Sequence, residues 1–369
     1  MKLSHNLFFL IQIQIAPPLV EIMSSPTWVE LWSEKHQRPY FVNKKTKETK
    51  WKGVESVFQR YDRVAMCRKR RFPNDWSHAL EMNRFIVGRL TREAVEVLLG
   101  KFALEYYGCC AALHTTRPAP SLRVLDVGCG KGSDLRKWLF DDPKQIGVVH
   151  GIDGSPKSIQ KANANLKRWK GIMGFPQTAD VQYKVHDLRK KKPWASLFDN
   201  ELYDVVSAQF VLPYFFSTQA LATAFFTRAA EACRAGGVLI AVYPSEKELA
   251  ARFFTFDRAQ MMRETGMYTT VPLPEWYGLS LIGAPKKQVP AVRPPTPYHL
   301  CIEGTVDAPE YTVPEAALRE VLHKTGWSVV KLQSVQGYRY RNIGWQVNSD
   351  ASYAVNTLYN VLICKKKTN

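Results

Sequence analysis

Residues 123–135 join an apolar strand to a helix through a loop that contains three glycines. The strand, residues 124–127, has the short apolar run typical of a central parallel strand, and an amphipathic helix is expected over residues 134–140. Glycines permit positive φ angles and leave the backbone open to close approach. Those of the loop are Gly128, Gly130 and Gly132. The stretch therefore predicts an α/β fold that binds a nucleoside-bearing ligand at this loop.

Carboxylates on both sides of the loop favour one ligand class over another. A dinucleotide would place its pyrophosphate on the N-terminus of the helix. Asp126 and Asp134 flank the loop, however, and carboxylates repel a pyrophosphate but attract a cation. S-adenosylmethionine carries a sulfonium and an amino group, so it fits the loop better. A tight turn without any ligand is the remaining interpretation.

Three further strands are expected to bring polar residues to the same edge of the sheet. The second strand, residues 148–153, ends in Asp153, whose carboxylate suits ribose hydroxyls. The third, residues 181–187, ends in Asp187, which can accept from the adenine amino group. The fourth, residues 203–210, opens a loop at the same edge. Because ligands of open α/β sheets collect outside the carboxyl ends of the strands, these ends predict one binding site.

The charge balance favours a polyanionic partner. Lys and Arg number 51 against 33 Asp and Glu, which gives a formal net charge of +18. Such an excess is typical of proteins that bind nucleic acid. Three basic runs are candidate phosphate contacts or localisation signals; they are residues 68–71, 189–192 and 365–367.

The seven cysteines show no paired CxxC spacing, so neither a zinc site nor a disulfide framework is expected, and a reducing compartment follows. Near the N-terminus, residues 7–15 are apolar behind Lys2, like the core of a signal peptide, but too short to span a membrane. We interpret residues 1–25 as a disordered lead or an extended start of the gene.

Residues 26–54 form a small pattern of their own, with two tryptophans that bracket three short β-runs. The spacing resembles that of a WW domain; its marker residues are Trp28, Tyr40, Asn43, Thr46 and Trp51. This resemblance implies that Tyr40 and Trp51 clamp a proline-rich peptide. The lysine-rich turn favours a phosphorylated or acidic ligand, such as the tail of RNA polymerase II. An ordinary β appendage without a ligand is the alternative.

The rest of the chain divides into a basic linker, residues 55–78, and one large domain, residues 79–369. Within the large domain, helical spacing of apolar residues predicts a helix over residues 79–99 that lies against the sheet. The downstream half adds three more segments: a Gln-Phe run at 209–216, the run 298–313 that contains EGTVDAPEY, and a final strand at 357–363.

Together with GCGKGSDL at 128–135, these segments resemble the mRNA cap guanine-N7 methyltransferase family over residues 82–367. The resemblance implies a doubly wound, Rossmann-like class I methyltransferase sheet of seven strands. It also implies S-adenosylmethionine as cofactor, the capped 5′ end of mRNA as substrate, and a nuclear location.

The resemblance also implies roles for individual residues. The donor would contact Asp126, Gly128, Gly130, Asp134, Asp153, Asp187, Gln209 and Tyr214. Cap phosphates would lie near Lys131 and Lys137, and the guanine would be held by Glu310 and Tyr359, with Asn83 and Pro213 at the edge of its pocket. A carboxylate can accept from the N1 and N2 hydrogens of guanine, and aromatic rings can stack on the base.

Three positions depart from the family pattern. Pro213 stands where the family has a histidine, Val87 falls at the position of a donor-site lysine, and Asn165 replaces a basic residue. The leading hypothesis is methylation of the cap guanine at N7, with the WW domain recruiting a proline-rich partner. Because N7 has a free lone pair, the reaction needs positioning by Tyr214, Glu310 and Tyr359 and no general acid or base.

Two alternatives remain. One is methylation of another base at the capped 5′ end, which Pro213 motivates. The other is a catalytically weak adaptor that binds capped RNA.

Overall fold

The computed structural model describes most of the chain in segments; these are residues 28–33, 38–43, 46–47, 49–51, 86–99, 121–139, 146–172, 174–253, 277–281, 295–302, 306–335, 337 and 355–368. The chain forms two compact units, residues 1–55 and 56–369. The predicted lead at 1–25 and the predicted linker at 55–78 lie outside the described residues.

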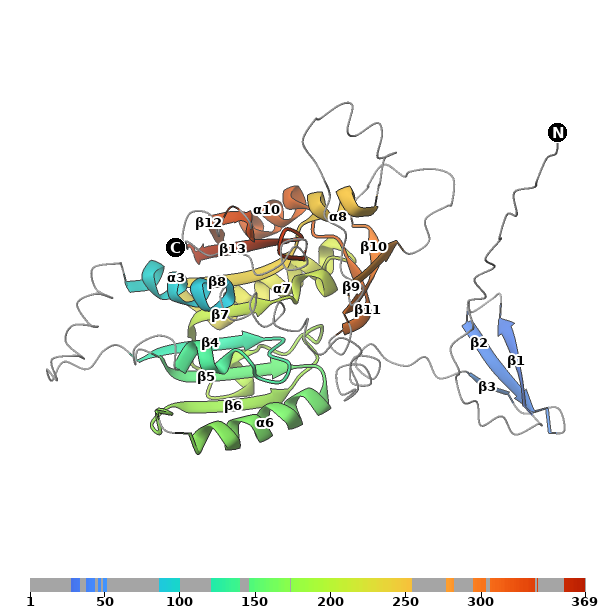
Figure 1. Ribbon diagram of the computed structural model, residues 1–369, viewed down its shortest axis with the longest axis horizontal. Helices are drawn as coiled ribbons and strands as arrows, with labels where there is room; N and C mark the ends of the chain where they lie inside the picture. The colour runs from blue at the N-terminus through green and yellow to red at the C-terminus, as the bar shows by residue number, and fades with distance from the viewer. Residues whose placement is uncertain are drawn as a thin grey trace, which may run out of the picture. The chain divides into compact units, whose positions relative to one another are not determined.

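The first unit contains a three-stranded antiparallel sheet, in the order β1 (Trp28–Ser33), β2 (Arg38–Asn43), β3 (Thr49–Trp51) (Figure 1). A tight turn follows β2, where the Asn43 side chain accepts a hydrogen bond from the backbone N–H of Thr46 at 3.2 Å. In the sheet, Tyr40 and Trp51 are cross-strand partners. The three predicted β-runs of the front module are confirmed.

The second unit is built on a seven-stranded sheet, with strand order β12-β13-β8-β7-β4-β5-β6. Strands β6, β5, β4, β7 and β8 are parallel, whereas β13 is antiparallel to both of its neighbours. The bounds are β4 Leu122–Val127, β5 Ile146–Asp153, β6 Asp180–Val185, β7 Tyr203–Gln209, β8 Cys233–Pro244, β12 Trp327–Ser334 and β13 Tyr359–Lys366.

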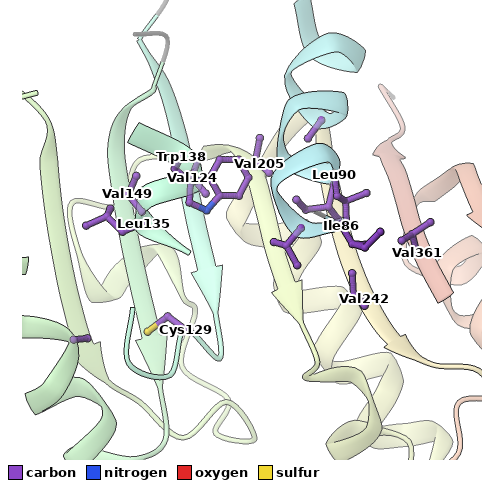
Figure 2. Close-up of a cluster of buried hydrophobic side chains, with 14 of the residues drawn as sticks. Ile86, Leu90, Val124, Cys129, Leu135, Trp138, Val149, Val205, Val242 and Val361 are labelled. Atoms are coloured by element: carbon purple, nitrogen blue, oxygen red, sulfur yellow. The ribbon is translucent and has the colours of Figure 1, made fainter. Parts of the chain in front are cut away.

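Helices cover both faces of this sheet. One face carries α3 (Gly88–Leu99), α5 (Leu135–Leu139) and α6 (Pro156–Lys170); the other carries α7 (Gln219–Ala232) and α10 (Glu315–Lys324). Neighbouring strand residues alternate between the two cores, because successive side chains of a strand point to opposite faces. Val124 packs with Leu135 and Trp138 of α5, as Figure 2 shows, whereas Leu125 packs on the opposite side. The doubly wound fold is therefore confirmed.

The parallel strands meet at a switch point. The chain leaves β4 for β5 on one side and later returns to pair β7 on the other side of β4. Open α/β sheets bind ligands where the strand order reverses in this way, because the loops on either side of that point diverge and leave a crevice. The glycine loop after β4 lies at this point.

A second, three-stranded antiparallel sheet, in the order β11-β10-β9, belongs to the same unit. Its strands are β9 (Tyr277–Leu281), β10 (Pro297–Ile302) and β11 (Val306–Tyr311). Strand β11 lies against the short 3-10 helix η3 (Leu212–Phe215), which follows β7. This contact brings the small sheet to the carboxyl end of the large one.

Element boundaries differ from the predictions by a few residues. Helix α5 begins at Leu135 instead of residue 134, and β6 ends at Val185, so Asp187 lies two residues beyond its strand. Helix α3 begins at Gly88, after a short π turn at 86–87; residues 79–85 of the predicted helix lie outside the described residues. None of the helices in the described segments is long and apolar enough to cross a membrane.

Candidate active site

The glycine loop is fastened to the end of β5. The backbone N–H groups of Gly128 and Cys129 donate to the carbonyl oxygen of Ile152 at 2.8 and 3.1 Å. The carboxylate of Asp153 accepts from the N–H of Gly130 at 2.9 Å and from the N–H of Ser155 at 2.7 Å. Asp153 therefore orders the loop and caps the turn into α6.

All three loop glycines have positive φ: 71° at Gly128, 52° at Gly130 and 72° at Gly132. Space is a second constraint. A Cβ on Gly128 would lie 2.1 Å from Cγ2 of Val211, and one on Gly132 would lie 2.8 Å from the hydroxyl oxygen of Tyr183. The loop therefore needs glycine at 128 and 132 both for its backbone conformation and for its packing.

The loop gathers three carboxyl groups. Asp126 is only 3% exposed, and burial raises the pKa of its carboxyl well above the ordinary value. The nearby carboxylates of Asp134 and Asp153 raise the same pKa further, whereas Lys137 and a hydrogen bond from Ser207 lower it. Lys137 is itself buried and forms an ion pair with Asp134. Three carboxyl groups thus face one ammonium, and the arrangement favours a cationic ligand.

Gln209, at the end of β7, completes this side of the site. Its Nε2 donates to Oγ of Ser207 at 3.2 Å, and Ser207 in turn hydrogen-bonds Asp126. The buried Oε1 of Gln209 has no hydrogen-bond partner among the described residues. A buried acceptor without a partner is costly, so a ligand that presents N–H groups would relieve it.

Asp187 is held differently from the other aspartates. Both of its oxygens accept from Arg189: Oδ1 from the backbone N–H at 3.1 Å and from Nε at 3.0 Å, and Oδ2 from Nη2 at 2.9 Å. These bonds lower the pKa of Asp187. The carboxylate is therefore ionised and shares its oxygens with an arginine of the basic run 189–192.

A second group of polar side chains lies where the small sheet meets η3. Glu310 of β11 is 3% exposed and accepts from the hydroxyl of Tyr298, its cross-strand partner in β10, at 2.5 Å. The hydroxyl of Tyr214, from η3, also hydrogen-bonds this carboxyl. Burial raises the pKa of Glu310 to about 7, and the two phenol hydrogen bonds limit the rise. Glu310 is thus a buried carboxyl held by two phenols from different elements.

Aromatic residues continue this second group. The ring of Phe210 meets the ring of Tyr359 edge-on, with centroids 5.5 Å apart. Phe210 has a φ of 58°, which is unusual for a residue with a side chain. Pro213 is buried in η3, between Leu212 and Tyr214. The two residues after β7 and the helix η3 therefore connect the carboxylate-rich loop with the carboxyl of Glu310.

Comparison with known proteins identifies the family of each unit of the chain. The model of the mRNA (guanine-N(7))-methyltransferase domain matches residues 110–350, which is more than half of the chain, and the model of the WW domain matches residues 24–52. The chain belongs to the mRNA (guanine-N(7))-methyltransferase family. The predicted family and the predicted WW domain are confirmed.

Relatives of the family share moderate identity with this chain. The mRNA cap guanine-N(7) methyltransferase of Caenorhabditis elegans is 31% identical over 144 residues, which cover 38% of this chain and 36% of the relative. That of Drosophila melanogaster is 27% identical over 232 residues, or 62% of this chain and 51% of the relative. The mRNA cap guanine-N(7) methyltransferase 1 of Oryza sativa subsp. japonica is 29% identical over 196 residues, which cover 52% of this chain and 49% of the relative. The chain thus spans about half or less of the length of these relatives.

S-adenosylmethionine is the cofactor of this methyltransferase family, and the carboxylate-rich loop fits it. The amino group and sulfonium of this molecule are cationic, which suits Asp126, Asp134 and Asp153. Its N–H groups suit the unpartnered Oε1 of Gln209. The residues present therefore match the chemistry of the cofactor on two independent grounds, charge and hydrogen bonding.

The structure brings most of the predicted donor residues together around β4, β5 and β7, and it joins Tyr214 of η3 to Glu310 of β11. The backbone carbonyl of Lys131 accepts from Nδ2 of Asn165 at 3.0 Å. Asn83, predicted at the edge of the cap pocket, lies outside the described residues, as do the side chains of Tyr40 and Trp51. The roles predicted for these methyltransferase residues stay predictions.

Several residues of the site carried no predicted role. Ser207 links Asp126 to Gln209, Tyr298 holds Glu310, and Phe210 packs on Tyr359. The sequence contains one signal that could have found Tyr298: it is the first aromatic residue of a strand that precedes the VDAPEY strand by a short turn, as in a hairpin. Without the register of that hairpin, its pairing with Glu310 could not be predicted.

Proposed function

We propose that this chain transfers a methyl group from S-adenosylmethionine to N7 of the guanine cap of mRNA. Membership of the family supports the reaction class, and the chain's own residues support the substrate. The observation that carries the proposal is the buried carboxyl of Glu310, fixed by Tyr298 and by Tyr214 of η3, the short helix that follows β7.

Guanine offers N1–H and N2–H groups on one edge and an acceptor, N7, on the other. An ionised carboxylate at Glu310 would accept from the first edge, which leaves N7 free to face the donor. Two phenols that donate to Glu310 favour its ionised form against the effect of burial. The guanine would then be selected by hydrogen bonds that adenine, with its different edge, cannot make.

Positioning is the main contribution expected of this site. S-adenosylmethionine supplies an activated methyl group when bound, and N7 of guanine already has a free lone pair. The chain's residues then need only to orient the base and exclude water. Tyr214 is suited to this because it follows Gln209 by five residues, in η3, and its hydroxyl also hydrogen-bonds Glu310. Such alignment contributes roughly 7–11 kcal/mol in well-oriented reactions.

The edges of the pocket have further proposed roles. Tyr359 would stack on the guanine, with Phe210 against its ring. Lys131 would lie near the cap phosphates. Lys137, which pairs with Asp134, would act mainly by offsetting the negative charge around the donor. Pro213 supplies no polar group at the place where the family has a histidine, so base selection would depend on Glu310.

One product assay tests the proposal. The purified chain is incubated with labelled S-adenosylmethionine and RNA that begins with GpppA, GpppG or a triphosphate, and the RNA is then digested to nucleosides. Label is expected in 7-methylguanosine from both capped RNAs and in nothing from the triphosphate RNA. Label in the first transcribed base, and none in 7-methylguanosine, would show that the acceptor is a different base.

The WW domain is proposed to recruit a proline-rich partner, with the tail of RNA polymerase II as the first candidate and the nucleus as the place of action. The match to the WW model and the cross-strand pair Tyr40 and Trp51 support a groove of the expected kind. Trp51→Ala is expected to abolish binding of a proline-rich peptide while turnover on a short capped RNA stays unchanged. Unaltered peptide affinity in this variant would argue against the groove.

A further inference from the structure

Helix α6 has an unusual charge pattern. Its fifteen residues, Pro156–Lys170, include five cations and no carboxylate. All five cations are exposed, and within the described segments none of them forms an ion pair; they are Lys157, Lys161, Lys167, Arg168 and Lys170. The helix therefore presents positive charge that its own fold leaves without compensation.

Two other helices of the same unit, α10 and α3, pair their cations with carboxylates. In α10, Arg319 pairs with Glu315 at 2.8 Å and Lys324 pairs with Glu320 at 2.5 Å. In α3, Arg92 pairs with Glu96 at 3.2 Å. These pairs have the four-residue spacing that stabilises a helix. Helix α6 therefore lacks the ion pairs at four-residue spacing that α10 and α3 form.

The stability of the helix does not account for the cation in its first turn. Cations near the C-terminus of a helix interact favourably with its dipole, which suits Lys167, Arg168 and Lys170. Lys157 lies in the first turn, where the dipole disfavours a positive charge. An anionic ligand outside the protein would offset this unfavourable interaction of Lys157 with the helix dipole.

The position of the helix points to the kind of partner. Lys157, Lys161, Asn165 and Arg168 are spaced by four, four and three residues, so they lie on one face. That face adjoins the glycine loop, because Asn165 donates to the carbonyl oxygen of Lys131 at 3.0 Å. The helix runs beside β6 at the edge of the large sheet (Figure 1). From Lys157 to Arg168, eleven helical steps apart, the cations extend for about 16 Å.

From this geometry we infer that the face formed by Lys157, Lys161 and Arg168, here named the α6 basic face, binds the sugar-phosphate backbone of the first transcribed nucleotides. The inference rests on the proposed function, which places the cap triphosphate near Lys131. A row of cations that passes beside the loop and runs along a helix suits the phosphates of a nucleotide chain. Single-stranded RNA is therefore the partner, and its contacts carry no base specificity.

The test compares a long substrate with a short one. The triple variant Lys157→Gln, Lys161→Gln, Arg168→Gln is assayed on a capped RNA of about twenty nucleotides and on the dinucleotide GpppA. Loss of three phosphate contacts should lower the affinity for the long RNA about tenfold or more at moderate salt and reduce its salt slope by about two. The kcat/KM for GpppA should stay unchanged, because the dinucleotide ends before the α6 basic face.

A matched control removes the same charge elsewhere. Lys247→Gln, Arg319→Gln, Lys324→Gln replaces two exposed lysines and one exposed arginine outside α6 and outside the three basic runs. Equal loss of RNA affinity in both triple variants would mean that net charge alone attracts RNA and would overturn the α6 basic face. Unchanged RNA affinity in the α6 variant would also overturn the proposal. If an acidic peptide binds the wild type but not the α6 variant while RNA affinity is unchanged, the face binds an acidic protein segment instead of RNA.

Failure of the proposed function would look different. If the wild type methylates neither substrate, filter binding of triphosphate RNA of the same length still tests the face. A deficit confined to the α6 variant would then support RNA binding without cap methylation, and no deficit would overturn both.

Discussion

The two halves of the proposed active site are built in different ways. The donor half depends on backbone geometry: Gly128 and Gly130 adopt positive φ, and their N–H groups bond Ile152 and Asp153 at the end of the neighbouring strand. The acceptor half depends on side chains from separate elements that meet around Glu310. A backbone cradle tolerates little change at its glycines, whereas a side-chain cluster can alter its specificity by single substitutions. The two halves should therefore respond differently to mutation.

The largest separation between the halves is expected from Glu310→Ala. Removal of a buried hydrogen-bonded carboxyl should lower kcat/KM on GpppA about 100-fold or more, because guanine N1–H and N2–H lose their acceptor. Calorimetry should show donor affinity within about twofold of the wild type. Glu315→Ala, an exposed carboxylate of α10, is the control and should change neither quantity. Equal loss of donor and cap binding in Glu310→Ala would mean that the two halves are not separable.

Gly128→Ala should affect the donor half instead. The new Cβ would lie 2.1 Å from Cγ2 of Val211, and the alanine would have to adopt a φ of 71°. We therefore expect the free energy of unfolding to fall by about 2–4 kcal/mol. Donor affinity should fall with it. Gly326→Ala separates the two causes, because Gly326 has a φ of 83° but open space around it. If both variants lose the same stability in a thermal melt, contact with Val211 is not the reason that glycine is needed at 128.

Tyr298→Phe should give the smallest and most specific effect. Burial raises the pKa of Glu310 to about 7, and the Tyr298 hydroxyl lowers it, so loss of this hydroxyl should raise the pKa further. Cap binding needs the ionised carboxylate; it is therefore present above that pKa and lost as the pH falls through it. The acid limb of GpppA binding should move to higher pH, with affinity at pH 7 reduced about tenfold.

Tyr203→Phe is the matched control for this shift. Tyr203 is equally buried, and its hydroxyl lies 2.8 Å from Nδ1 of His150, far along the chain from Glu310. Its removal should leave the acid limb in place. If the limb stays where it is in Tyr298→Phe as well, or moves equally in both variants, Tyr298 does not set the ionisation of Glu310.

The same contrast explains what could be predicted from the sequence. The donor half could be predicted because its determinants are local: a strand, three glycines and flanking carboxylates occur within residues 123–135, and strand ends gather at one sheet edge. The acceptor half depends on the register of β10 with β11 and on the contact between β11 and η3. Tertiary contacts of this kind leave no periodic pattern, so Glu310 was found only through family resemblance and Tyr298 was not found.

Phe210 has a backbone conformation that the local sequence does not predict. Its sequence context predicts the last residue of a strand, yet its φ is 58°, and β7 stops at Gln209. A left-handed residue with a bulky side chain costs of the order of 1–3 kcal/mol, which the surrounding structure must offset. Nothing in the residue type signals this conformation, because glycine or asparagine would be the expected residues there.

That conformation has a directional consequence. The positive φ at residue 210 ends the extended strand immediately after Gln209. Gln209 hydrogen-bonds Ser207 within β7, whereas Phe210 meets the ring of Tyr359. A glycine at this position would relax the backbone but leave Tyr359 without its edge-on support. In the proposed function this kink lies between Gln209 on the donor side and Tyr359, the residue proposed to stack on the guanine, so the placement of the base beside the methyl donor is expected to depend on the backbone conformation of one residue.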